Sequence, residues 1–178
     1  MTLDEINSFY EYINKVNAEN RVRTDKQDLE DAIEDLLILA YMNGVEAVNK
    51  MLDAAIKADE LDAARSVFAE IKGKTFVDRV REYAETEDVE AIRRVVDTET
   101  HRVYNEASMY AARKAGAKEK TWVTMLDEKV RDTHDYLESM TIPIEDRFYT
   151  FDGDSADAPG GFENAENNCG CRCELEFS

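Results

Sequence analysis

The sequence predicts a mainly α-helical protein with a small α+β module at its C-terminal end. Apolar residues recur at three- and four-residue intervals through most of residues 3–114, which is the period of amphipathic helices. After Gly116 this period gives way to short runs of β-forming residues separated by turn-forming residues. We therefore expect a helical domain of about five helices at residues 1–116. A short-stranded sheet with one helix should follow at residues 117–178.

Five segments of the predicted helical domain carry the helical period. A capping-box pattern at Thr2 and Glu5 opens the first segment, which is expected to end near Asn20. The other four helices are expected at residues 24–56, 60–71, 76–83 and 89–114. Gly73 and Gly116 are placed to end the third and the fifth helix, because glycine readily adopts the left-handed conformation of a helix C-cap.

The predicted C-terminal module begins with a β-forming run at residues 121–126. A helix is expected from Asp127 or Glu128 to Glu138, and Pro143 indicates an extended link at residues 142–144. Further short strands are predicted at residues 148–151 and 171–177. Between them, residues 152–168 are acidic and rich in turn-forming residues, so we expect a long acidic loop there.

Charge and composition limit the classes of function. Lys and Arg number 22 against 40 for Asp and Glu, giving a formal net charge of -18. Such a charge repels a phosphate backbone, so direct nucleic-acid binding is not expected. There is no apolar run of ~18 residues, so no membrane span is expected. The start of the chain also lacks the pattern of a signal peptide, which favours a protein made and used inside the cell.

Asp127, Arg131 and His134 are the first candidates for chemistry in the module. At positions i, i+4 and i+7 of the predicted helix they would share one face, and Asp127 would pair with Arg131. His134 could then serve as a general base or a metal ligand. The alternative is that the three residues hold the helix against the sheet. Trp122 is expected to anchor the small core, and His101 is expected at the surface.

The three cysteines, Cys169, Cys171 and Cys173, lie within five residues, which favours a reduced compartment over a secreted disulfide framework. On an extended strand Cys169 and Cys173 would lie ~13 Å apart, too far for one metal ion unless the chain turns at Gly170. The plausible zinc ligands are Cys171, Cys173 and His134, with Cys169 as a further candidate. A disulfide formed on oxidation and plain packed thiols remain open alternatives.

Several motifs of this sequence resemble those of the minor head, or head morphogenesis, proteins of tailed phages, a group often called Mu F-like. The motifs in the module are KTWVT at 120–124, the Asp127, Arg131 and His134 spacing, and Cys171-Arg172-Cys173. Upstream segments at 71–80, 98–107 and 114–116 extend the resemblance to roughly residues 70 to 177.

The resemblance implies a structural and assembly protein that associates with phage portal or capsid proteins during capsid assembly or genome delivery. It would act in the host cytoplasm during assembly and then in the virion head, without catalysis and without a cofactor other than possible zinc. A homo-oligomer is also compatible with these expectations. The alternative from another class is a toxin-like hydrolase or transferase that uses His134 with Arg131 as an anion clamp.

Overall fold

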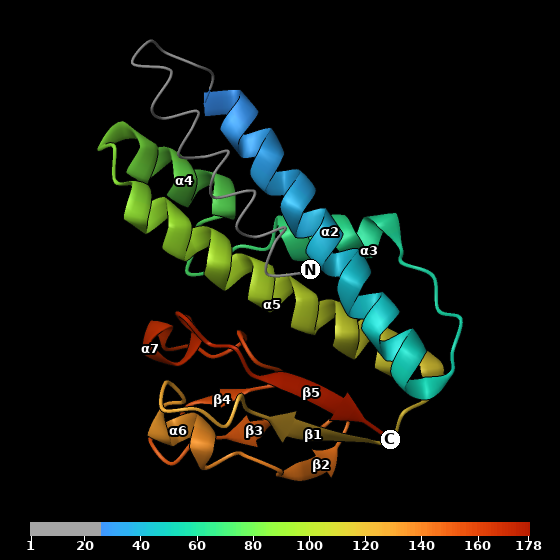
Figure 1. Cartoon of the computed structure of the whole chain (residues 1–178). Helices are drawn as coiled ribbons and strands as arrows, with labels where there is room; N and C mark the ends of the chain where they lie inside the picture. The colour runs from blue at the N-terminus through green and yellow to red at the C-terminus, as the bar shows by residue number, and fades with distance from the viewer. Residues whose placement is uncertain (1–25) are drawn as a thin grey trace.

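The computed structural model describes residues 26–178, so the helix predicted near residues 3–20 lies outside the described part. A layer of helices lies against a small α+β module (Figure 1). The helices of the layer are α2 (Lys26–Leu52), α3 (Glu60–Val67), α4 (Phe76–Glu85) and α5 (Val89–Ala115). The module contains β1 (Glu119–Val123), α6 (Asp132–Asp135), β2 (Thr141–Pro143), β3 (Phe148–Tyr149), β4 (Ser155–Ala156), α7 (Ala165–Asn168) and β5 (Glu174–Phe177). The predicted fold class is confirmed.

Local sequence explains where three of these helices begin. The Asp59 carboxylate accepts from two backbone N–H groups at the start of α3. Thr75 and Asp78 form a reciprocal capping box at the start of α4, and Asp88 caps α5. At the other end of α5, Gly116 has φ 83, the left-handed C-cap that the sequence predicts.

Two helices end earlier than the periodicity predicts. The second ends at Leu52 rather than near residue 56, because the side chain of Asn49 binds both the N–H and the carbonyl of Ile56 at 2.8 Å and folds the chain back. The third ends at Val67, before an isolated β-bridge between Ile71 and Lys74. Side-chain hydrogen bonds in the first place, and the backbone bonds of a bridge in the second, thus replace those of another helical turn.

The main helix pair of the layer is α2 with α5, and Gly44 lies where the two helices approach closely. A Cβ atom at position 44 would lie 2.3 Å from the carbonyl oxygen of Tyr104 and 2.9 Å from the Cβ of Ala107. The hydroxyl of Ser108 donates to the Gly44 carbonyl at 3.3 Å across the same contact. Gly44 therefore serves helix packing, and it does not interrupt α2.

In the module, β1 lies at the centre of a three-stranded antiparallel sheet with strand order β2-β1-β5. The register places Trp122 opposite Leu175, and both side chains are buried. Strand β5 also contacts α2 and α5, so it joins the sheet to the helices (Figure 1). A second sheet pairs β3 with β4.

The hydrophobic core runs without interruption from the helices into the module. One cluster of buried side chains includes Val103 and Ala107 of α5 together with Trp122, Phe148 and Leu175 of the module. Gly160 marks a close backbone contact between the module and α5, since a Cβ there would lie 2.9 Å from the Cα of Arg102. None of the described helices is long and apolar enough to cross a membrane.

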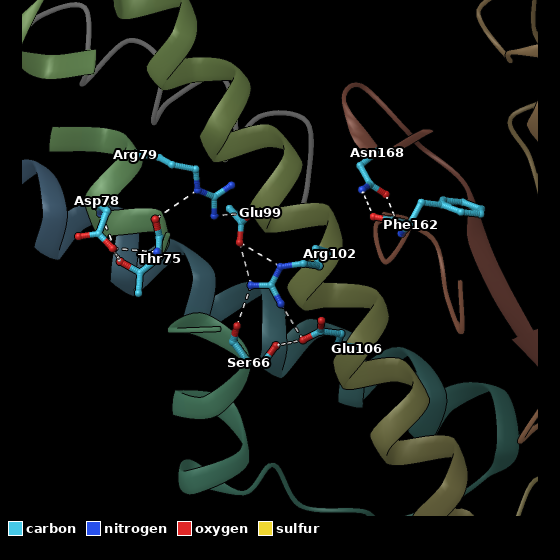
Figure 2. Close-up of polar contacts among 9 residues, drawn as sticks. All are labelled: Ser66, Thr75, Asp78, Arg79, Glu99, Arg102, Glu106, Phe162 and Asn168. Carbon is cyan, nitrogen blue, oxygen red and sulfur yellow. Dashed lines mark hydrogen bonds and ion pairs between the residues drawn. The ribbon is translucent and has the colours of Figure 1, made fainter. Parts of the chain in front are cut away.

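The segment at residues 152–168, expected as a long loop, contains β4 and α7. Ala156, Asn167 and Asn168 within it are buried. Most of the segment is irregular, as expected, but polar side chains here bind the segment's own backbone and hold it against the module. The amide of Asn168, for example, binds both the N–H and the carbonyl of Phe162 (Figure 2).

Candidate functional site

His134 lies on α6, which is much shorter than the predicted helix of residues 127–138. The helix covers only Asp132–Asp135, and Arg131 precedes it with extended dihedrals, φ -78 and ψ 150. The carboxylate of Asp127 accepts the N–H of Lys129 at 3.0 Å, which forms a local turn in place of the first helical turn. The prediction that Asp127, Arg131 and His134 share one helical face is therefore wrong.

Asp127 and Arg131 do not pair with each other. The guanidinium of Arg172 donates to both carboxylate oxygens of Asp127, at 2.8 and 2.7 Å. This hydrogen-bonded pair lowers the pKa of Asp127 to about 2. Arg131 instead donates to the backbone carbonyls of Glu166 and Cys169, at 2.5 and 2.6 Å. Both arginines thus fasten the segment before β5, and Arg131 is not positioned as an anion clamp.

His134, Cys171 and Cys173 meet in the interior of the module, although 37 residues separate the histidine from the nearer cysteine. The Nδ1 atom of His134 lies 3.5 Å from the Sγ of Cys171 and 3.4 Å from the Sγ of Cys173. The three residues are 1%, 7% and 4% exposed, respectively. Cys169 is exposed, and it is not part of this cluster. We call His134, Cys171 and Cys173 the His–Cys cluster.

Aromatic rings form one wall of the His–Cys cluster. The ring of Trp122 meets the imidazole of His134 edge-on at 5.3 Å, and the ring of Phe162 stacks on it at 5.4 Å. Trp122 also contacts Phe148 at 5.1 Å. The bonds between Asn168 and the backbone of Phe162 fix the position of the stacked ring (Figure 2). Trp122 is thus the core anchor that the sequence suggests, and it adjoins the cluster directly.

The two thiols of the cluster differ in acidity because they interact with each other. The hydrogen bond from Cys173 lowers the pKa of Cys171, against the effect of burial. The same hydrogen bond, together with burial, raises the pKa of Cys173.

The space beside the cluster is small. A cavity of about 10 Å³, which Met125, Lys129 and Gly170 help to line, adjoins the three side chains. That volume is near the lower limit for one water molecule. A larger cavity of about 540 Å³ lies between α5 and residues 157–161, and it contains no member of the cluster. The space at the cluster is therefore large enough for an ion or one water molecule but not for an organic substrate.

Asp154 is a site residue that the sequence reasoning missed. It is 6% exposed, and its carboxylate accepts from the N–H groups of Ser155, Glu163 and Asn164 and from the side chain of Asn167. Burial alone would raise its pKa, but these hydrogen bonds lower the pKa below its ordinary value. Asp154 thereby folds the segment that carries Phe162 over His134. The sequence shows only one aspartate among several in an acidic stretch.

The helical layer also holds a buried ionic network (Figure 2). Arg102 donates to the carboxylate of Glu99 at 3.0 and 2.8 Å and to the carbonyl of Ser66 at 2.7 Å. Arg79 of α4 pairs with the other oxygen of Glu99 at 2.9 Å, and Glu106 pairs with Arg102 at 2.8 Å. The network connects α3, α4 and α5 at the level where the module meets α5.

His101, expected at the surface, is half-buried on α5. Burial lowers its pKa to about 4, although the carboxylate of Glu174 and the backbone of Cys173 act in the opposite direction. The expectation was wrong because β5 packs against this part of α5, which the sequence of the helix alone does not show.

Comparisons with known proteins place the chain in a viral context. The family model described as Phage Mu protein F like protein matches residues 31–176. Minor head protein GP7 of Bacillus phage SPP1 is 34% identical over 83 residues. That alignment covers 45% of this chain and 27% of the relative, so the chain spans about a quarter of the relative's length. No significant match was found among solved structures.

Proposed function

Because the chain belongs to the family of Phage Mu protein F like proteins, we propose that it is a minor head protein that binds portal or capsid proteins. It would do so in the host cytoplasm during capsid assembly and would then remain in the virion head or take part in genome delivery. The observation that carries this proposal is the family match over residues 31–176. The action would be association rather than catalysis.

A group of exposed apolar side chains on α2 supports a docking role for the helical layer. Ile38, Leu39 and Met42 are 36%, 39% and 54% exposed. Their spacing of one and three residues places them on neighbouring positions of one helix face. We call these three residues the α2 apolar face. Apolar groups exposed together are typical of surfaces that bind another protein.

The proposal can be tested by co-purification with defined partners. The full chain, carrying an affinity tag, is co-expressed with the portal protein of the same phage and, separately, with its major capsid protein. We expect one of them to co-purify in a fixed ratio. The double variant Leu39→Glu/Met42→Glu should abolish co-purification, because it places two carboxylates within the α2 apolar face.

Leu126→Glu provides a matched control for that variant. Leu126 is 75% exposed in the module, so its replacement adds a carboxylate at an exposed leucine outside the α2 apolar face. Circular dichroism should show that both proteins stay folded. Failure of both partners to co-purify would contradict the proposed function. Loss of binding in the Leu126 variant alone would move the docking surface to the module.

A further inference from the structure

We propose that His134, Cys171 and Cys173 bind one zinc ion, with a water molecule as the fourth ligand. The inference rests on the geometry of the His–Cys cluster and does not depend on the proposed function. It goes beyond the assembly role, because it assigns a chemical task to three residues of the module, whereas the α2 apolar face belongs to the helical layer.

The distances within the cluster fit a tetrahedral zinc site. With zinc–sulfur and zinc–nitrogen bonds of ~2.3 and ~2.1 Å, tetrahedral angles place nitrogen and sulfur ligands ~3.6 Å apart and two sulfurs ~3.8 Å apart. The observed distances from His134 Nδ1 to the two sulfurs are 3.5 and 3.4 Å. All three ligand atoms lie within 4.8 Å of one another. One ion can therefore reach all three without a rearrangement of the backbone.

The ligand types favour zinc over harder cations. Thiolates and imidazole select zinc and other soft or borderline metals, whereas magnesium and calcium take oxygen ligands. The cluster contains two sulfurs and one nitrogen and no carboxylate. Two thiolates would also neutralise the charge of a divalent zinc ion, so that the buried site would carry no net charge.

The surroundings of the cluster leave room for one small fourth ligand. The adjoining cavity of about 10 Å³ can admit about one water molecule. Cys169 is exposed on the far side of Gly170, whose φ of 66 turns the chain between Cys169 and Cys171. In the described part of the chain the converging ligand atoms come from His134, Cys171 and Cys173 alone.

Zinc would join the segment before β5 to α6. Cys171 and Cys173 lie in that segment, and His134 is on α6. A metal bound to the folded state stabilises that state, because the unfolded chain does not hold the ligands together. The zinc would thus act as a cross-link within the module.

The test is to measure zinc in the full chain, purified without a metal-binding tag and under reducing conditions. Elemental analysis should find one zinc per chain. The variants Cys171→Ser, Cys173→Ser and His134→Ala should each lose at least nine-tenths of it. Cys169→Ser is the matched control, since it removes a neighbouring thiol from outside the cluster, and it should keep the full amount.

Thiol titration and cobalt substitution keep the test decisive if a cluster variant fails to fold. A thiol reagent should modify one cysteine per native chain, Cys169, and all three only after a chelator and a denaturant are added. Cobalt added to the native apoprotein should produce a sulfur-to-cobalt charge-transfer band that Cys169→Ser retains. Less than a tenth of a zinc per chain, or three thiols reactive in the native protein, would overturn the proposal. Loss of zinc from Cys169→Ser would overturn the three-residue ligand set.

Discussion

At the scale of single residues, the most consequential side chains are charged groups that lie inside the protein. Glu99 and Arg102 are 1% and 2% exposed, yet they meet at 2.8 Å, and Arg79 and Glu106 complete their pairing. A buried ion pair adds little net stability compared with apolar residues of the same volume. Removing one partner is costly, however, because it leaves the other charge buried without compensation.

Replacement of Arg102 by methionine should therefore lower the free energy of unfolding by about 3–5 kcal/mol. Urea unfolding monitored by circular dichroism measures the change. Arg113→Met is the control, because the Arg113 pair with Glu145 has side chains 41% and 70% exposed and should contribute at most ~1 kcal/mol. Equal losses in the two variants would show that burial does not determine the strength of these pairs.

Asp154 should make the module sensitive to acid. Because the folded protein lowers the pKa of this carboxyl group, its contribution to stability is present above the ordinary value of about 3.9 and is lost as the pH falls through the lowered pKa. Asp154→Asn should destabilise the protein by about 1–3 kcal/mol at pH 7 and weaken the loss of stability below pH ~4.

The measurement for Asp154 is urea unfolding at a series of pH values from neutral down into the acid range. Asp157→Asn serves as the comparison, because Asp157 has an exposed side chain and uses its backbone carbonyl for the contact with Lys120. If the two variants show the same pH dependence, the carboxylate of Asp154 is not the group that responds to acid.

At the scale of secondary-structure elements, the packing of α2 on α5 depends on Gly44. Within a helix, Gly→Ala ordinarily stabilises a protein by roughly 0.5–1 kcal/mol. Here the new Cβ would lie 2.3 Å from the carbonyl oxygen of Tyr104, so the two helices would have to separate. We expect Gly44→Ala to destabilise the protein by about 1–3 kcal/mol, as overpacking does. A higher melting temperature for this variant would show that α2 and α5 do not pack this closely at Gly44.

The sequence was sufficient for elements that depend on local signals. α5 follows its prediction to within a residue or two, because Asp88 and Gly116 provide its caps and its apolar period is regular. The predicted helix at 127–138 was wrong because Asp127 binds the N–H of Lys129 and then pairs with Arg172, a residue distant in sequence. The helical period of the sequence cannot reveal a side-chain contact that competes with the first helical turn.

The same contrast holds for the candidate site. The cysteine spacing and His134 were recognisable as possible ligands, and the structure brings Cys171 and Cys173 to His134. The exclusion of Cys169 depends on the turn at Gly170 and on the bond of Arg131 to the Cys169 carbonyl. The role of Asp154 depends on contacts up to 13 residues away, which only the folded chain defines.

At the scale of the whole molecule, the continuous core predicts that the described helices and the module unfold together. The buried cluster joins Val103 and Ala107 to Trp122 and Leu175. Trp122 is the single tryptophan, so its fluorescence reports the module, whereas far-ultraviolet circular dichroism reports mainly the helices. The two signals should give coincident urea transitions. Separate midpoints would instead support two independent domains divided near residue 116.

The chemical reactivity of one lysine inside the sheet would report how often the module opens. Lys120 on β1 is 0% exposed, donates to the Asp157 carbonyl at 2.8 Å and lies 5.4 Å from the ring centre of Phe148. Burial lowers its pKa to about 8, so mild alkali would leave much of the amine neutral and nucleophilic yet shielded. Acylating reagents would modify it only during excursions in which the strand is exposed. Mass spectrometry can compare the rate of acylation of Lys120 with the rate for surface amines. The difference between the two rates would measure how often the strand becomes exposed under native conditions.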